Sequence, residues 1–473
     1  MQRFASFICF LLPLVTVCQP TLPEQSFPGV IESMEGQAYL QVGRSAYIDT
    51  ILIEAGKDHH FRTSGFRGVD MTLWTDQDTL HYTYVNFPHG QTVVFPLRSP
   101  RDSATLQLEF QASSSYFAAD YMARRRGTYD FDIPEVYELA NVILYLSDCS
   151  ARTPNRPDPD AYIHRVEAYF SPFRDHKVIQ ILNNLCVQEN AFPTYMAFRE
   201  NSICYSFDKA GRLQYDTPYK SVRYHEGIAG GVFRQLLYLV QDFADQSDFR
   251  SFFAGNREYY QSLLDRQKEL LNIRQMWDWL EREFPDSQDS YRILSSPLIG
   301  GSHSTAHFRD GYPLEPSFTE CIMFINTTRN IDTPGKFPED LKEPLYAGIV
   351  FTEIDHNYVN PASREHRKAI ANLMDNLNTW ATEAAMSNYR SASSVFNEYM
   401  THALFCLYLS DVFPKEIADR AIEKRIQLMD RRGFLKFSMF VDILREHLQQ
   451  TSSTIYEEYG SIIARVQKVV GMD

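Results

Sequence analysis

The sequence of 473 residues lacks several motifs that mark common enzyme classes. It has no Cys-x-x-Cys pair, no Gly-x-Ser-x-Gly segment, no phosphate-binding P-loop and no glycine fingerprint for a dinucleotide. These absences disfavour a zinc ribbon, a thioredoxin-like protein, a serine hydrolase, an NTPase and a Rossmann oxidoreductase. Basic residues are also few, with 46 Lys and Arg against 60 Asp and Glu and a formal net charge of −14. The basic cluster at residues 124–126 is predicted to be a solvated turn, so we expect no binding of nucleic acid.

Long apolar runs are missing except at the start of the chain. Arg3 is followed by about fourteen apolar residues, fewer than the roughly 20 that span a bilayer. This pattern predicts a secretory signal peptide over residues 1–18, and hence an exported protein of the periplasm, the outer membrane or the extracellular space. The alternative is a buried strand of the first domain. Cys18 has the place of a lipidated cysteine and is a candidate lipid anchor, although Val17 is larger than the residue that usually precedes one.

Cysteines are few and irregularly spaced. Two of the seven fall in the predicted signal peptide, and the other five are Cys149, Cys186, Cys204, Cys321 and Cys406. Most of these are expected to be buried, small apolar side chains. One or two disulfides are compatible with export, and the odd number requires a free thiol or an intermolecular link.

The rest of the chain has two regions, which together predict an α+β protein. Residues 19–128 are predicted to form a small β-sandwich-like domain with antiparallel strands at residues 38–42, 47–53, 79–85, 92–95 and 104–110. This domain would bind a ligand, or shield or position the next domain. Residues 129–473 are predicted to form a helix-rich, zincin-like domain, because apolar residues recur at helical spacing. Its small sheet is expected to include residues 291–294, 320–325 and 346–350.

One segment of the helix-rich region has the residues of a metal site. A helical interpretation of residues 350–358 places Glu353 and His356 on one face. In the HExxH motif of zinc peptidases, two His bind zinc and the intervening Glu activates water. Here Thr352 stands where the first His would be, and a hydroxyl is a poor zinc ligand beside imidazole. His356 is therefore the predicted metal ligand, and Glu353 is either the general base or a ligand itself.

A second predicted helix supplies further donors. Glu398 and His402 lie four residues apart in an otherwise apolar helix, and buried groups of this kind need a partner or a metal. The segment resembles the Asn-Glu helix that provides the third zinc ligand of gluzincin peptidases, which makes Glu398 the second predicted ligand. Tyr399 or His402 would stabilise a tetrahedral oxyanion. In the alternative interpretation, Glu353 and His356 form a hydrogen-bonded pair. Glu398 and His402 are then a structural pair.

These segments together resemble a known family. The stretches at residues 351–361 (Phe-Thr-Glu-Ile-Asp-His-Asn-Tyr-Val-Asn-Pro), 396–404 (Phe-Asn-Glu-Tyr-Met-Thr-His-Ala-Leu) and 168–176 (Ala-Tyr-Phe-Ser-Pro-Phe-Arg-Asp-His) are similar to an exported bacterial family catalogued as domain of unknown function 4932. The family occurs chiefly in gut Bacteroidota, and the resemblance covers about residues 130–460. It implies a gluzincin-like metallopeptidase fold with Glu353, His356 and Glu398 as site residues, although no activity is established for the family.

Three functional hypotheses follow. The first is an exported, zinc-dependent, peptidase-like hydrolase of peptide or amide bonds. Its zinc ion, held by His356 and Glu398, would polarise the carbonyl while Glu353 takes the proton, and an edge strand near residues 300–307 would bind the substrate backbone. The second, favoured by Thr352, is a non-catalytic surface or periplasmic binding protein on a degenerate peptidase scaffold. The third is a metal site that is only structural.

Overall fold

The computed structural model describes residues 3–7, 25–26, 29–42, 49–55, 58–63, 69–84, 91–110, 117–151, 156–188, 191–219, 228–310 and 318–470. The chain divides into two compact units. Unit 1 comprises Met1–Arg126, Pro134–Phe253 and Phe308–Thr319, and unit 2 comprises Gly127–Ile133, Ala254–His307 and Glu320–Asp473. Helices and several small sheets are both present, so the chain is a mixed helix and sheet protein, which agrees with the predicted α+β class.

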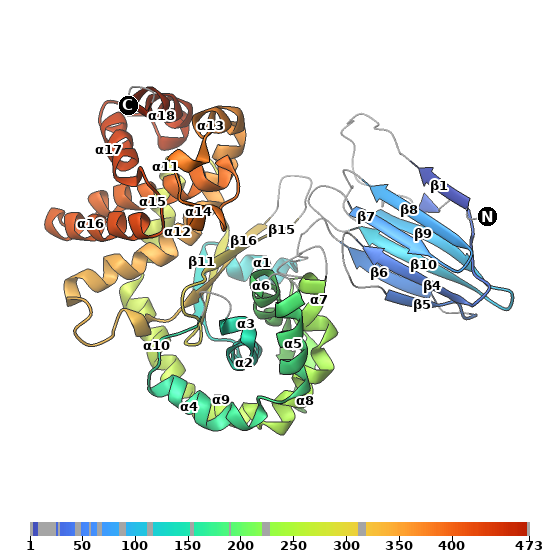
Figure 1. The fold of residues 1–473 in the computed structure, drawn as a ribbon. Coiled ribbons are helices and arrows are strands. Elements are labelled where there is room, and N and C mark those ends of the chain that lie inside the picture. Colours follow the sequence, from blue (N-terminus) through green and yellow to red (C-terminus); the bar gives the residue numbers. More distant parts are fainter. Residues whose placement is uncertain are drawn as a thin grey trace. The chain divides into compact units, whose positions relative to one another are not determined.

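Unit 1 begins with two small β-sheets that share one core (Figure 1). One sheet has the order β1-β8-β7-β4-β5, and the other has the order β2-β9-β10-β6, with β3 also paired to β9. Apolar residues of both sheets, such as Leu40, Leu73, Phe95 and Leu106, are buried together between them. The strands are β1 (Arg3–Phe7), β2 (Gln25–Ser26), β3 (Ile31–Glu32), β4 (Gln37–Val42), β5 (Asp49–Leu52), β6 (Asp58–Thr63), β7 (Val69–Trp74), β8 (Asp78–Tyr84), β9 (Gln91–Arg98) and β10 (Ser103–Phe110).

The predicted antiparallel pairing is correct for only part of these sheets. The pairs β4–β5, β4–β7, β7–β8 and β9–β10 are antiparallel. In contrast, β1 runs parallel to β8, β2 and β3 run parallel to β9, and β6 runs parallel to β10. β1 lies within the predicted signal peptide. Its pairing with β8 agrees with the alternative prediction, in which this segment is a strand of the first domain. Residues 8–18, with the candidate anchor Cys18, lie outside the described residues, so the signal peptide stays a prediction.

The rest of unit 1 is mainly helical. The basic residues predicted as a turn instead end a helix, in which Arg124 forms an exposed ion pair with Asp120. The helices are α1 (Ala119–Arg125), α2 (Glu135–Leu146), α3 (Asp148–Ala151), α4 (Ala161–Phe170), α5 (Lys177–Gln188), α6 (Ala191–Asn201), α7 (Ile228–Gln235), α8 (Leu237–Gln246) and α9 (Phe249–Gly255). A hairpin of β12 (Tyr205–Phe207) and β13 (Leu213–Tyr215) follows α6.

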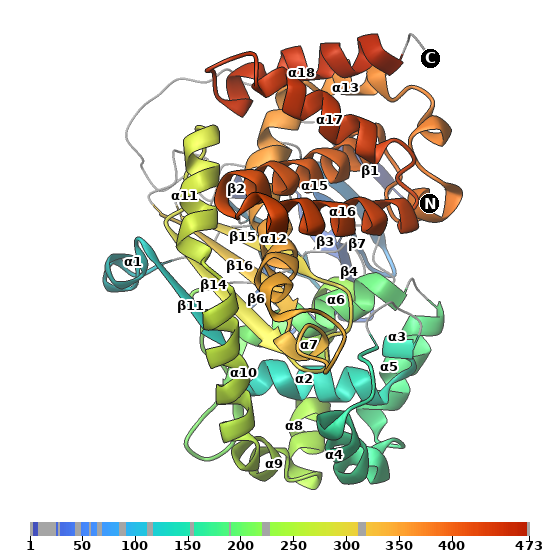
Figure 2. The same cartoon turned by 90° about the vertical axis from the view of Figure 1, so that its left-hand side faces the viewer.

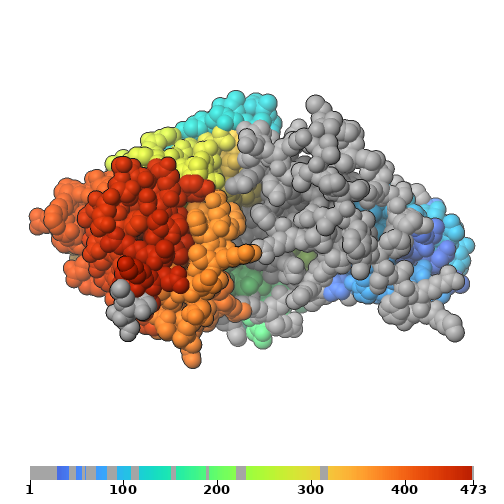
Figure 3. Space-filling view, turned by 90° about the horizontal axis from the view of Figure 1, so that it is seen from above, coloured from blue at the N-terminus to red at the C-terminus, as the bar shows by residue number. Residues whose placement is uncertain are grey.

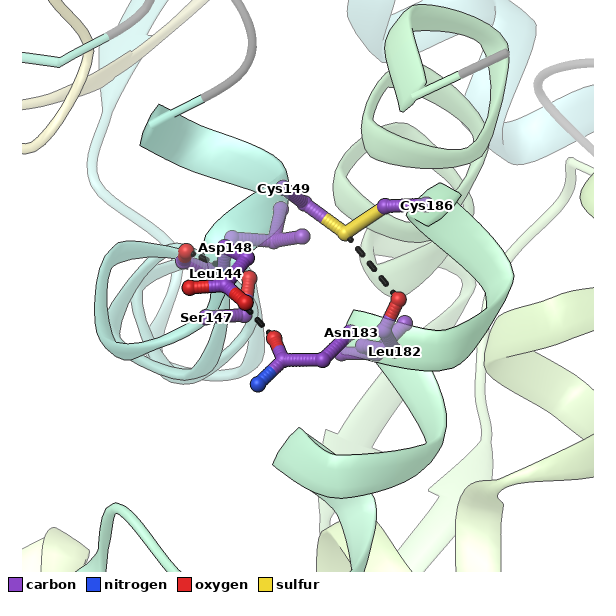
Figure 4. Close-up of a disulfide and its surroundings, with 7 residues drawn as sticks. All are labelled: Leu144, Ser147, Asp148, Cys149, Leu182, Asn183 and Cys186. Carbon is purple, nitrogen blue, oxygen red and sulfur yellow. Dashed lines mark hydrogen bonds between the residues drawn. A yellow bond between two sulfur atoms is a disulfide. The ribbon is translucent and has the colours of Figure 1, made fainter. Parts of the chain in front are cut away.

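A disulfide between Cys149 and Cys186 links α3 to α5 (Figure 4). Beside it, the backbone N–H of Asp148 donates a hydrogen bond to Asn183 Oδ1 at 2.7 Å, which joins the same two helices. One of the disulfides that the sequence allows is therefore present. The other cysteines of the described residues, Cys204, Cys321 and Cys406, are buried, as expected, and form no disulfide.

Most residues of a four-stranded sheet with the order β11-β14-β16-β15 belong to unit 2. The strands β11 (Thr128–Asp132), β14 (Ser290–Ser296) and β16 (Phe318–Asn326) run parallel to one another, and β15 (Ser304–Asp310) forms the edge next to β16. Alternate residues of the central strands, including Tyr291, Ile293, Cys321 and Met323, enter the main core of the unit. Alternate residues of a strand share one face, and the same core contains apolar residues of the helices. Helices therefore cover that face of the sheet.

The helices of unit 2 pack on this sheet and on one another (Figure 2). They are α10 (Arg257–Leu270), α11 (Ile273–Glu283), α12 (Glu339–Glu365), α13 (Arg367–Leu373), α14 (Glu383–Met386), α15 (Ala392–Val412), α16 (Lys415–Arg431), α17 (Phe437–Leu448) and α18 (Ile455–Val470). In Figure 3, the side chains of the C-terminal helices, in orange to red, form one continuous mass. Among the described residues, no helix is both long and apolar enough to cross a membrane.

The predicted strand at residues 346–350 is wrong, because this segment lies inside α12. Tyr346, Val350, Ile354 and Tyr358 are all buried and follow one another at four-residue spacing, which is the period of a helix. A window of five apolar residues does not reveal this period, and a longer window does. The helical interpretation of residues 350–358 is confirmed.

Candidate functional site

Two helices of unit 2 bring acidic and imidazole side chains together. Glu353 and His356 belong to α12, Glu398 and His402 belong to α15, and the two helices share the buried apolar core of the unit. His356 Nε2 lies 3.7 Å from Glu398 Oε1. His402 Nε2 lies 3.5 Å from Glu398 Oε2. Positions 356 and 398, which are far apart in the sequence, therefore meet at one carboxylate.

Hydrogen bonds fix the neighbouring polar residues of the two helices. Asn397 Nδ2 of α15 donates to Asn360 Oδ1 of α12 at 2.7 Å, which holds the register of the helix pair. Thr352, the residue in place of the expected His, bonds to its own helix. Its hydroxyl faces the carbonyl oxygens of Gly348 and Ile349 at 2.9 and 3.1 Å. Its hydroxyl is thus used by the α12 backbone.

The C-terminal end of α16 positions an arginine beside the cluster. Gly433 follows Arg432 with a φ of 86°, a conformation that favours glycine and ends the helix. The N–H of Phe434 then donates to the carbonyl of Met429 at 3.0 Å, which closes the last turn. This turn fixes the backbone from which the Arg432 side chain extends.

Arg432 contacts both the carboxylate and one imidazole of the cluster. Its Nη2 donates to Glu398 Oε2 at 2.7 Å and to the Tyr389 hydroxyl at 2.5 Å. Its Nη1 lies 2.5 Å from His402 Nε2. The guanidinium also lies over the ring of Phe434, 5.4 Å from its centroid. Arg432 is therefore the cation that neutralises Glu398.

A second arginine of α16 lies deeper. Arg425 is 8% exposed, and its Nη1 lies 2.9 Å from His402 Nδ1. Its guanidinium stacks over the ring of Phe405 at 4.5 Å, a cation–π contact. Gly348 of α12 makes room for both groups, because a Cβ at this position would overlap the guanidinium and the ring. Burial lowers the pKa of Arg425 to about 10, so the guanidinium stays charged at neutral pH.

His402 therefore faces a guanidinium at each ring nitrogen. Burial lowers the pKa of His402 to about 3, although the contact with Glu398 opposes this shift. The ring is thus neutral at pH 7, with one N–H donor and one acceptor nitrogen. Only one of the two arginine contacts can be a hydrogen bond that His402 accepts. The cluster has more N–H donors than acceptors at this imidazole.

Glu398 is the ionised centre of the cluster. Burial alone would raise the pKa of Glu398, but the contact with His402 and the charge of Arg432 hold it well below its usual range. The same carboxylate acts on Tyr389, where burial and the charge of Glu398 raise the pKa to about 12. At neutral pH, Glu398 is a carboxylate and Tyr389 is a neutral phenol.

Asp355 is the other buried carboxyl group near this point. It lies on α12, is fully buried, and neither of its oxygens has a hydrogen-bonding partner with normal geometry. Burial raises the pKa of Asp355 well above its usual range, and the Thr401 hydroxyl offsets only part of the shift. A protonated Asp355 leaves Arg425, Arg432 and Glu398 with a net charge of +1.

These residues do not fit a zinc centre. Zinc lies about 2.0–2.2 Å from its ligands, so the predicted ligands His356 and Glu398 would both have to face the ion. The Arg432 guanidinium already donates a hydrogen bond to Glu398 Oε2 at 2.7 Å. At an effective dielectric constant of about 20, a doubly charged ion 4 Å from a guanidinium meets a repulsion of about 8 kcal/mol. Within the ranges that the structure describes, no three His, Cys, Asp or Glu side chains are grouped to hold a metal ion.

The remaining predicted site residues lie beside the cluster. Tyr399, predicted to stabilise an oxyanion, is buried, and its hydroxyl donates to the carbonyl of Trp380 at 2.7 Å and accepts from the N–H of Lys436 at 3.0 Å. Both hydrogen bonds of this hydroxyl are thus made with the backbone. Glu353 is half-buried on α12, one turn before His356. Its role as general base stays a prediction.

The sequence patterns did not indicate the two arginines or Tyr389. Arg425 lies on α16 and Arg432 directly follows this helix, which carries no metal-site motif, and Tyr389 lies between α14 and α15. An Arg-Gly pair such as Arg432-Gly433 is typical of the end of a helix, and this signal would place a cation at a helix terminus. It does not indicate which carboxylate the cation meets, because that depends on how α16 packs.

Comparison of the chain with protein families, with curated proteins and with solved structures finds no match. The resemblance to domain of unknown function 4932 rests on the segments quoted above and stays a prediction. The cluster on α12, α15 and α16 is therefore the feature from which a function can be inferred.

Proposed function

We propose that the chain is an exported binding protein on a degenerate peptidase-like scaffold, with an arginine in the place of a catalytic metal. The observation that carries this proposal is the contact of Arg432 with Glu398 at 2.7 Å and with His402 at 2.5 Å. A guanidinium supplies the positive charge that a buried carboxylate requires. It cannot act as a Lewis acid or lower the pKa of a bound water to about 7, as zinc does. The guanidinium therefore cannot take over the Lewis-acid role that zinc has in a peptidase.

A gluzincin-like scaffold is part of the proposal. Its support is the order of the elements, in which α12 with Glu353 and His356 follows the sheet, and α15 with Glu398 follows α12. This order agrees with that of the motifs in the family that the sequence resembles. Thr352 in place of the first His supports a scaffold that has lost its metal.

The ligand that we propose is an extended peptide or protein segment. β15 lies at one edge of the sheet of unit 2. An edge strand binds an extended chain by adding it as a further strand through main-chain hydrogen bonds. The acidic balance of the chain favours a ligand that is not strongly acidic.

Export is supported by two independent features. The first is the predicted signal peptide at residues 1–18. The second is the disulfide between Cys149 and Cys186, because disulfides persist in oxidising compartments and are rare in the cytosol. The candidate lipid anchor at Cys18 remains a proposal of the same kind.

Metal analysis and a peptidase assay of the purified protein test the proposal. We expect far less than one zinc per chain after dialysis against zinc, no cleavage of a peptide library, and binding of extended peptides to the immobilised protein. One zinc per chain that is lost in both Glu398→Ala and His356→Ala, with cleavage abolished by Glu353→Gln, would establish the hydrolase instead. Zinc that is retained without any cleavage would indicate a structural metal.

A further inference from the structure

One edge of the first N-terminal sheet is formed by a segment that export would remove. β1 pairs in parallel with β8, so that Arg3 to Phe7 lie opposite Asp78 to Tyr82 (Figure 1). All of β1 belongs to the predicted signal peptide, residues 1–18. In the part of the chain that the structure describes, β8 pairs otherwise only with β7. Without β1, the N–H and C=O groups on that side of β8 would lose their partners.

The sequence of β8 lacks the features that protect an exposed edge strand. Natural edge strands are short, carry charged residues or Pro, or are covered. β8 has seven residues, contains no Lys, Arg, Glu or Pro, and has its one Asp, Asp78, at the first position. By contrast, β5 at the opposite edge has only four residues and begins with Asp49. In the second sheet, the edge strand β6 contains Asp58 and Arg62. β8 therefore has the composition of a strand that is covered on both sides.

We infer that, once the signal peptide is removed, β8 pairs with β8 of a second copy of the chain, so that the exported protein is a dimer. The inference rests on the proposed function, because it requires export with removal of β1. Strands that pair across a two-fold axis run antiparallel. All seven residues find a partner only when His81 lies opposite the partner's His81. In this register Asp78 lies opposite the partner's Tyr84, so the acidic residue of the strand does not face its own copy.

The faces of the sheet agree with this pairing. His81 is exposed on the outer face, where its Nδ1 lies 3.0 Å from the Thr72 hydroxyl of β7. The neighbouring Leu80 is 4% exposed and belongs to the core between the two sheets. Because alternate residues of a strand face opposite sides, the pairing joins outer face to outer face and core to core. Directly opposite Cα atoms of an antiparallel pair are about 4.5–5.5 Å apart, within the range of about 4.4–6.8 Å that a disulfide requires.

Light scattering of the exported protein after size-exclusion chromatography tests the inference. We expect a protein that lacks β1 by N-terminal sequencing and has about twice the mass of one chain. His81→Lys places two positive charges opposite each other at the axis and should halve this mass. Thr50→Lys is the matched control, because it adds the same charge to an exposed position of β5, the other edge strand of the sheet, and should leave the dimer intact.

A cysteine at the axis gives a second measurement that does not require a destabilised variant. With oxidised glutathione, His81→Cys should form an intermolecular disulfide, seen as a product of doubled mass on a non-reducing gel, and Thr50→Cys should not. Cys204, Cys321 and Cys406 are buried and so are protected from this reagent. A single-chain mass of the exported wild type, a dimer that persists in His81→Lys, or no cross-link in a folded His81→Cys protein would overturn the inference and leave the proposed peptide binding intact. An exported protein that retains β1 would also overturn it, whereas zinc binding with peptide cleavage would overturn the proposed function.

Discussion

A Glu398→Gln substitution keeps the shape of the side chain and removes the charge at the centre of the cluster. The carboxylate is 11% exposed, and its partner Arg432, at 2.7 Å, is 30% exposed. Removing one partner of a buried ion pair costs about 3–5 kcal/mol, because the other charge stays buried without compensation. Since Arg432 keeps part of its hydration, we expect the free energy of unfolding to fall by about 2–4 kcal/mol at pH 7.

The effect of Glu398→Gln should depend on pH in one direction. The pKa of Glu398 is lower in the folded protein than in the unfolded chain. A carboxyl group of this kind contributes stability above its unfolded pKa, about 4.3, and loses that contribution as the pH falls toward the folded pKa. The difference between the wild type and the variant should therefore shrink by about 1–2 kcal/mol between pH 6 and pH 3.

Urea unfolding followed by tryptophan fluorescence measures this difference. Three of the four tryptophans, Trp277, Trp279 and Trp380, lie in unit 2, so the signal reports mainly on the unit that holds the cluster. Glu423→Gln is the matched control, because Glu423 is an exposed residue of α16, and the change should be within about 0.5 kcal/mol. A loss in Glu398→Gln no larger than that of the control, or a loss that is equal at pH 6 and pH 3, would refute the ion-pair reasoning.

Three further predictions concern the packing and the charges around the cluster. Gly348→Ala should lower the free energy of unfolding by about 1–3 kcal/mol, because the added Cβ overlaps the Arg425 guanidinium; urea unfolding measures it, and an unchanged midpoint would contradict the close contact. Wild-type stability should decrease as the pH falls from about 6.5 toward the folded pKa of His402, about 3. Over that window residue 402 binds a proton in the unfolded chain but not in the folded protein, so the free energy of unfolding falls by at most about 1.4 kcal/mol per pH unit. The substitution His402→Gln should therefore flatten this pH dependence. Replacing both Cys149 and Cys186 by Ser should cost about 3–4 kcal/mol, as expected for a disulfide that closes a loop of this length; unchanged stability, or a thiol count in the denatured wild type that includes both cysteines, would contradict the disulfide.

The sequence was sufficient to predict the convergence of two helices but not the partner that fills the cluster. Glu353 and His356, and then Glu398 and His402, have helical spacing, and each pair lies in a segment apolar enough to be buried. Local periodicity therefore predicts which faces of α12 and α15 are polar. The strand at residues 346–350 was wrong because a short window of apolar residues does not distinguish the periods of strand and helix. The parallel pairings of the N-terminal sheets were missed because pairing between distant strands leaves no local signal.

The identity of the cation depends on a third helix, which explains why a motif was not enough. A metal site is predicted from donors, and the donors are the same whether a zinc ion or a guanidinium neutralises Glu398. Two residues distinguish the cases: Thr352 offers no imidazole donor on α12, and Arg432 supplies one cation at the end of α16. A metal site with fewer imidazole ligands binds its ion weakly, and an arginine beside a complete site repels the ion. In this chain Arg432 forms an ion pair with Glu398, so the interpretation of a metal-site motif should also consider arginines at nearby helix ends.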